Sequence, residues 1–178
     1  MSPDGPRIPP GSTAEIGPVN ALIARAIGLA TRTGPPNIFT TLARHRRLFR
    51  PWLRFAGRLM PGGKLPRADT ELLILRTAHN CGCEYEWRHH VRLGKRAGLS
   101  GEQIERIRSG TRDGFSERQN TLLQAADQLH QNRFIDDDVW DRLRPIFSTA
   151  ELIELCMLVG HYEMLAMTLN TLKVQPDA

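Results

Sequence analysis

The chain is poor in cysteine and lacks a recognisable leader segment. It has three cysteines among 178 residues. A small and odd number of cysteines argues against the disulfide framework that stabilises many secreted domains. The N-terminus is rich in proline and glycine where a signal peptide would carry an apolar segment. We therefore expect a cytoplasmic protein.

Long apolar runs and strand-like alternation are also missing. The most apolar stretch, residues 152–169, is interrupted by Glu154, His161 and Glu163, which argues against a membrane span. No segment shows the alternation of apolar and polar residues that is typical of a half-buried strand. From Pro18 onwards nearly every segment has helical periodicity instead. The predicted fold class is all-α, a compact multi-helix bundle.

The charge is moderate and spread along the chain. The formal net charge is +5 and the calculated pI is about 9.6. Charge of this size could attract an anionic small molecule, but charge alone is weak evidence for nucleic-acid binding. We expect no nucleic-acid partner.

Proline, glycine and capping residues suggest how the chain is organised. Residues 1–17 hold four prolines and predict a flexible N-terminal arm, followed by one helical domain over residues 18–178. Pro51 predicts a kink or break between helical stretches at 38–49 and 52–60. Three capping-box patterns predict helix starts: Ser100 with Gln103, Ser116 with Gln119, and Ser148 with Glu151. The last helix, 149–172, is apolar on more than one side, which favours a homo-oligomer.

One segment concentrates groups that can carry chemistry. Cys83, Glu86 and His90 are spaced i, i+3 and i+7, so on a helix they fall within about 60° of one another. The basic residues of this segment lie on the opposite side. The predicted helix therefore turns a thiol, a carboxylate and an imidazole toward the core, where burial is costly unless such groups are paired or used. This pattern predicts a reaction or binding site.

A second carboxylate belongs to the same candidate site. Glu71 lies on an apolar stripe of the preceding helix, and two antiparallel helices could point it at His90. Alternatively, Glu71 has no role in a site and is a glutamate of the first helical turn, where the helix dipole favours a negative charge. Cys83 lies near a helix N-terminus, which can stabilise a thiolate, although a buried cysteine is more often an inert core residue.

The histidines and cysteines nearby do not form a good metal-binding pattern. Cys81 and Cys83 are too close in sequence for the usual zinc spacing. His89 projects about 100° away from His90 on a helix. We expect no metal ion and no cofactor.

The spacing of these residues resembles a known superfamily. Glu71, Cys83, Glu86 and His90 follow the pattern of the carboxymuconolactone decarboxylase and alkylhydroperoxidase D-like (AhpD-like) superfamily, whose redox-active members carry Glu and then Cys-x-x-Cys-x-x-x-His. Residues 84–90 resemble its "EYEW…H" subgroup. The resemblance extends over residues 37–172 and implies an all-helical fold that assembles as trimers or hexamers.

The chain departs from the redox-active pattern at Glu86, which occupies the position of the second cysteine. Peroxide reduction by a pair of thiols is therefore not expected. Resemblance to the decarboxylase branch implies decarboxylation or isomerisation of a small carboxylic acid or lactone. In that case His90 gives or takes the proton, Glu71 orients His90, and Glu86 is a second base or polarises the substrate.

Two other functions stay open. Cys83 could act as a single-cysteine thiol peroxidase that is oxidised to a sulfenic acid and recycled by an external thiol. Alternatively, the buried polar cluster could hold a ligand in a non-catalytic oligomer. All three hypotheses imply a small-molecule partner, anionic in the decarboxylase case, and none requires a nucleic acid or a membrane.

Overall fold

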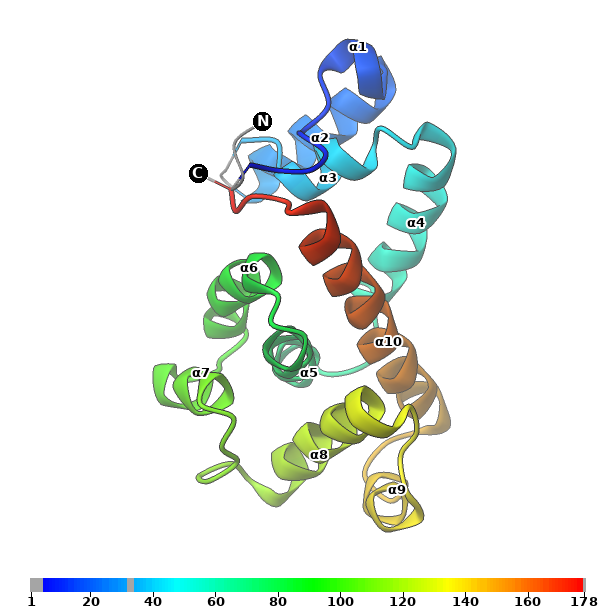
Figure 1. The fold of residues 1–178 in the computed structure, drawn as a ribbon. Coiled ribbons are helices and arrows are strands. Elements are labelled where there is room, and N and C mark those ends of the chain that lie inside the picture. The colour runs from blue at the N-terminus through cyan, green and yellow to red at the C-terminus, as the bar shows by residue number, and fades with distance from the viewer. Residues whose placement is uncertain (1–4, 32–33, 178) are drawn as a thin grey trace. The chain divides into compact units, whose positions relative to one another are not determined.

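The fold is built from helices. The computed structural model describes residues 5–31 and 34–177. In these ranges it contains ten helices and no strand (Figure 1). The predicted all-α class is confirmed. The chain divides into two compact units, residues 1–56 with 168–178 and residues 57–167. The prediction of one domain over residues 18–178 stays a prediction.

The first unit is formed by the N-terminal helices and the last residues of the chain. Its helices are α1 (Thr13–Ile16), α2 (Pro18–Thr31), α3 (Asn37–Leu42) and most of α4 (Arg46–Leu59). A small core contains Ile16, Ala21, Ala43 and Phe49. Of the predicted arm, residues 1–4 lie outside the described residues, and α1 occupies residues 13–16.

Of the kink or break predicted at Pro51, the break is wrong. Pro51 lies inside α4, and the chain instead leaves helical geometry between Leu42 and Arg46. A proline within a helix removes the N–H that would bond to the carbonyl four residues earlier. Because α4 starts at Arg46, the only donor lost is the one for the Arg47 carbonyl, near the start of the helix. A single missing bond is tolerated there.

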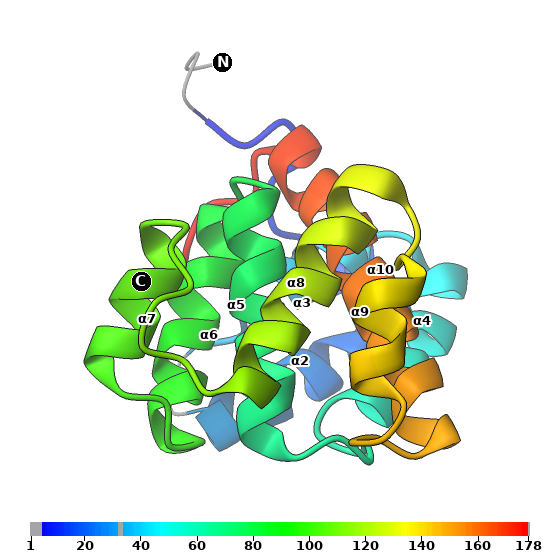
Figure 2. The ribbon, with the colours of Figure 1, turned by 90° about the horizontal axis from the view of Figure 1, so that it is seen from below.

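The second unit holds the residues of the candidate site. Helix α5 lies between α6 and α8, as Figure 2 shows, and it also contacts α7, while α8 contacts α9. Ten consecutive residues of α5, 69–78, are buried. A helix that is surrounded on all sides has no solvent face, which explains why its sequence lacks a polar stripe. The helices of this unit are α5 (Arg67–Asn80), α6 (Glu84–Arg96), α7 (Gly101–Arg108), α8 (Glu117–Asn132), α9 (Asp137–Leu143) and α10 (Thr149–Leu172) up to Met167.

The predicted helix starts are confirmed. Ser100 and Ser116 each accept a hydrogen bond from the backbone N–H three residues on, which completes both capping boxes. At the start of α10, the Ser148 hydroxyl accepts from the Glu151 N–H, and the Ser148 N–H donates to the Glu151 carboxylate. These local bonds satisfy N–H groups that the first helical turn leaves unpaired.

Helix α10 is unusually long and apolar. It is the one helix among the described residues that could cross a membrane by length and composition, with a mean hydropathy of 1.4. Half of that stretch is buried inside the protein, as expected for a core helix. Its length and hydropathy are therefore weak evidence for a membrane span.

Candidate functional site

The site depends on a close approach of α5 and α6 at Gly94. A Cβ added at Gly94 would lie 3.2 Å from a methyl carbon of Leu75, 3.2 Å from one of Leu99 and 3.8 Å from the Cβ of Glu71. A side chain larger than that of alanine would therefore press against α5. Because His90 lies one turn before Gly94, this contact also sets the separation between His90 and Glu71.

Glu71 and His90 form a buried pair between the two helices. His90 Nδ1 lies 2.8 Å from Glu71 Oε2, and the side chains are 5% and 0% exposed. Arg67 Nη2 lies 2.7 Å from the other carboxylate oxygen of Glu71. This second contact is an ion pair without the geometry of a directed hydrogen bond. The carboxylate is thus held between a histidine and an arginine, which offsets the cost of burying it.

Glu86 lies one turn before His90 and is buried without comparable support. Both of its carboxyl oxygens lack a hydrogen bond of normal geometry, and the residue is 2% exposed. Burial raises the pKa of Glu86 from 4.5 to about 8, and the neighbouring thiol of Cys83 lowers that pKa only in part. Glu86 is therefore mostly a neutral carboxylic acid near pH 7, able to donate a proton.

Cys83 is the N-cap residue of α6 and is 1% exposed. Burial and, next, the charge of Glu86 raise the pKa of its thiol to about 12, although the backbone N–H of Glu86 acts in the opposite direction. The helix N-terminus therefore does not produce a thiolate here. A helix end lowers a thiol pKa only where burial and nearby carboxylates do not outweigh it.

Tyr162 of α10 completes the cluster, and sequence reasoning did not assign it a role. Its ring lies edge-on to His90, with centroids 5.1 Å apart and planes at 86°. Its hydroxyl donates to Met60 Sδ at 3.5 Å. Burial, followed by the charges of Glu86 and Glu71, raises the pKa of the phenol well above its ordinary value. Tyr162 is thus an uncharged side chain that lies near both carboxyl groups. In the sequence, its place on an apolar helix indicated only that it is buried.

A pocket reaches the cluster at Cys83. It has a volume of about 170 Å³, and its lining includes Cys83, His79, Trp87 and Arg108. The guanidinium of Arg108 lies 4.9 Å from the centre of the Trp87 ring and pairs with Glu84 at 3.1 Å. Cys83 therefore lines a small cavity with an aromatic wall and a cation at its edge, whereas Glu71, Glu86 and His90 are not among its lining residues.

In the structure, the four predicted site residues form two neighbouring pairs. Glu71 binds His90, and Cys83 lies beside Glu86. His89 is only partly buried, with its ring 5.6 Å from that of His90. The Cys81 thiol lies 3.9 Å from His130 Nδ1 on α8. The catalytic roles of these residues stay predictions.

Comparison with known proteins agrees with this architecture. A model of the Carboxymuconolactone decarboxylase family matches residues 46–128. No curated protein matches the chain in sequence. Among solved structures, an uncharacterized peroxidase-related protein with an alkylhydroperoxidase AhpD core from Ralstonia eutropha JMP134 is 17% identical, with a TM-score of 0.86 over 97% of this chain and 92% of that one.

Two further structures share the fold. An uncharacterized peroxidase-related protein from Silicibacter sp. TM1040 is 15% identical, with a TM-score of 0.81 over 96% of this chain and 93% of that one. The debrominase Bmp8 is also 15% identical, with a TM-score of 0.77 over 96% of this chain and 92% of that one. A second structure of this debrominase is a complex with 2,3,4-tribromopyrrole, in which a cysteine is replaced by alanine.

These findings define the class of the protein. The helical architecture around α5 and α6 is the AhpD-like fold. Together with the family match over residues 46–128, it supports the carboxymuconolactone decarboxylase and AhpD-like superfamily that the spacing of Glu71, Cys83, Glu86 and His90 predicted. Membership of the "EYEW…H" subgroup stays a prediction.

The raised pKa of Glu86 predicts how stability depends on pH. The unfolded carboxyl titrates near 4.5 and the folded one near 8, so between these values the folded protein holds one proton more than the unfolded protein. The contribution of Glu86 to the free energy of unfolding is therefore present below pH 4.5 and falls as pH rises toward 8, by up to about 1.4 kcal/mol per pH unit.

Glu86→Gln should remove this decrease of the unfolding free energy with rising pH. Urea unfolding of the wild type and the variant between pH 5 and 8 measures it, and the variant should gain stability relative to the wild type as pH rises. Glu117→Gln, at an exposed position of α8, is the matched control and should keep the wild-type slope. Parallel pH profiles for the wild type and Glu86→Gln would contradict the burial of an unsupported carboxyl.

Proposed function

We propose that the protein is an enzyme that carries out general acid–base chemistry, decarboxylation or isomerisation, on a small carboxylic acid or lactone. The observation that carries this proposal is the 2.8 Å contact between buried Glu71 and His90, one helical turn from the unsupported carboxyl of Glu86. Groups with different protonation states at one pH are what acid–base catalysis requires.

The two sides of the cluster have complementary roles. Glu71 accepts from Nδ1–H of His90, which leaves Nε2 as the nitrogen that takes a proton. Glu86 is the donor. In an isomerisation, His90 removes a proton from the carbon next to a carbonyl, the electron pair moves into the conjugated system, and Glu86 protonates the other carbon. The proton held by His90 then returns to Glu86 through water. In a decarboxylation, the carbon–carbon bond breaks, CO₂ leaves, and the electron pair accepts the proton of Glu86, which water then restores.

The substrate is expected to enter through the pocket at Cys83. A volume of about 170 Å³ suits a small molecule. Arg108 at its edge supports a substrate with a carboxylate, and Trp87 offers a flat surface for a ring. The debrominase of the same fold forms a complex with 2,3,4-tribromopyrrole, which supports a small-ring substrate.

Exchange of substrate protons with solvent tests the proposal. A panel of small keto acids, unsaturated carboxylic acids and γ-lactones is incubated in D₂O and followed by NMR for deuterium incorporation, double-bond migration and loss of the carboxyl carbon. Peroxide and thiols are left out, so a redox reaction cannot contribute. Turnover that requires His90 and Glu86 supports the proposal. If no member of the panel exchanges above the rate of buffer, a non-catalytic ligand-binding protein becomes the better interpretation.

A single-cysteine thiol peroxidase is the second candidate, because Cys83 lines the pocket. Its thiol is buried beside Glu86, and its pKa is raised to about 12, so we expect it to resist alkylation and oxidation at pH 8. Mass spectrometry after iodoacetamide or peroxide treatment, in a Cys81→Ser, Cys156→Ser background, measures this. Modification of Cys83 within minutes at neutral pH would move the peroxidase to first place.

We also propose a cytoplasmic homo-oligomer, a trimer or hexamer. Helix α10 supports this, because it exposes Ile153, Met157, Met164 and Met167, and exposed apolar residues clustered on one helix favour a protein contact. Light scattering of the purified protein measures the mass.

A further inference from the structure

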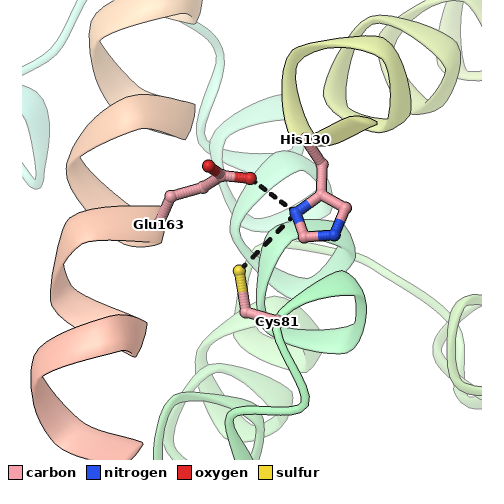
Figure 3. A group of neighbouring side chains, drawn as sticks. All are labelled: Cys81, His130 and Glu163. Carbon is pink, nitrogen blue, oxygen red and sulfur yellow. Dashed lines mark hydrogen bonds and ion pairs between the residues drawn. The ribbon is translucent and has the colours of Figure 1, made fainter. Parts of the chain in front are cut away.

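A second cluster lies outside the proposed catalytic site and uses none of its residues. Figure 3 shows Cys81, His130 and Glu163 turned toward one another from three separate helices. Cys81 is the C-cap residue of α5, His130 belongs to the last turn of α8, and Glu163 lies on α10. One ligand atom of each residue lies within 4.8 Å of the other two.

We propose that Cys81, His130 and Glu163 bind a divalent transition metal ion, with zinc as the best fit. A thiolate, an imidazole and a carboxylate are the three protein ligand types of zinc, and three protein ligands leave a fourth position for water. Such a mixed sulfur, nitrogen and oxygen set does not suit magnesium or calcium, which prefer oxygen ligands.

The distances are close to those that a tetrahedral site needs. With zinc–ligand bonds of ~2.0–2.3 Å, neighbouring ligand atoms lie ~3.3–3.7 Å apart. Cys81 Sγ and His130 Nδ1 are 3.9 Å apart, and His130 Nδ1 and Glu163 Oε1 are 2.6 Å apart. The first pair must close by a few tenths of an ångström and the second must open by less than about 1 Å. Rotation of the partly exposed His130 and Glu163 side chains can supply both changes.

The surroundings hold Glu163 in a suitable state. Arg133 Nη1 lies 2.6 Å from Oε2 of Glu163, so the guanidinium holds that oxygen and leaves Oε1 for the metal. The His130 and Glu163 side chains are 31% and 13% exposed, so an ion can reach the site from solvent. The metal would replace the proton between His130 and Glu163 and the proton of the Cys81 thiol.

A Cys-His-Glu catalytic triad fits the geometry less well. In a triad the histidine uses one ring nitrogen for the nucleophile and the other for the acid. Here the same atom, His130 Nδ1, faces both the thiol and the carboxylate. Convergence on one nitrogen is what a shared ion or proton requires. A metal at this point would tie α8 and α10 to the turn between α5 and α6, two residues before Cys83.

Cobalt and zinc titration of the full-length protein tests the proposal. The protein is first stripped with a chelator, and Co²⁺ is then added while the absorbance is recorded. We expect one equivalent to bind with a thiolate-to-cobalt charge-transfer band, Zn²⁺ to displace it with a Kd of about 1 µM or tighter, and excess Zn²⁺ to raise the Tm. Cys81→Ser should remove the band, and His130→Gln should weaken binding at least tenfold.

The controls separate this site from other thiols. Cys156→Ser, which removes an exposed cysteine of α10, should leave the band and the stoichiometry unchanged. Circular dichroism of each variant shows whether its helices are retained. The proposal is overturned by absence of stoichiometric binding, or by a band that survives Cys81→Ser or is lost in Cys156→Ser. Because none of these measurements depends on turnover, failure of the proposed acid–base function would leave them unaffected.

Discussion

Replacing His90 with glutamine is expected to lower the turnover of the substrate that the D₂O exchange assay identifies. The expected decrease is about 10²–10⁴-fold, the usual contribution of a positioned acid or base. Glutamine retains the size and polarity of the side chain but cannot take up a proton near neutral pH. The reason for a large effect is structural: His90 is the titratable base that the 2.8 Å contact with Glu71 holds in one orientation. Rates of deuterium incorporation, with KM measured separately, provide the test.

A companion substitution separates orientation from proton transfer. Glu71→Gln retains a side chain that can hydrogen-bond to His90, but it removes the negative charge between His90 and Arg67. The rate of Glu71→Gln should be intermediate between those of the wild type and His90→Gln. The imidazole is still present, but it is less well oriented and no longer has a negative charge beside it. His45→Gln, on an exposed position of the other unit, is the matched control and should have the wild-type rate. Equal rates for the wild type and His90→Gln would refute the proposed role of His90.

Gly94→Val is expected to damage both stability and activity. The valine Cβ would lie 3.2 Å from methyl groups of Leu75 and Leu99, and its two further methyl groups have no space between α5 and α6. Overpacking of this kind costs about 1–3 kcal/mol of unfolding free energy. If the helices separate by about 1 Å, His90 loses its distance to Glu71, and turnover should fall about 100-fold.

Gly94→Ala is the matched control for that substitution. Its single Cβ meets the ends of flexible side chains, which can move by a few tenths of an ångström. Alanine also gains about 1 kcal/mol over glycine in a helix interior, which offsets the tight contact. We expect near wild-type stability and activity. Urea unfolding and the D₂O assay measure both variants, and a valine variant that behaves like the alanine one would show that the helix separation at Gly94 does not set the site geometry.

Much of the local structure could be predicted because it depends on neighbours in the chain. The capping boxes at Ser100, Ser116 and Ser148 are satisfied within three residues, and all three helices begin as predicted. The side of α6 that faces the core also follows from periodicity, since Glu86 and His90 lie one turn apart and both are buried. The break expected at Pro51 failed because the position of a proline within its helix matters more than its presence.

The chemical state of the site depends on packing between helices, which no local pattern contains. Cys83 has the helix N-terminal position that can favour a thiolate, but burial beside Glu86 raises its pKa. Tyr162 reaches His90 from more than 70 residues further along the chain. Cys81, His130 and Glu163 likewise meet only because α5, α8 and α10 pack together. Helical periodicity shows which face of each helix is buried, whereas desolvation and contacts between distant residues arise only when those faces are assembled.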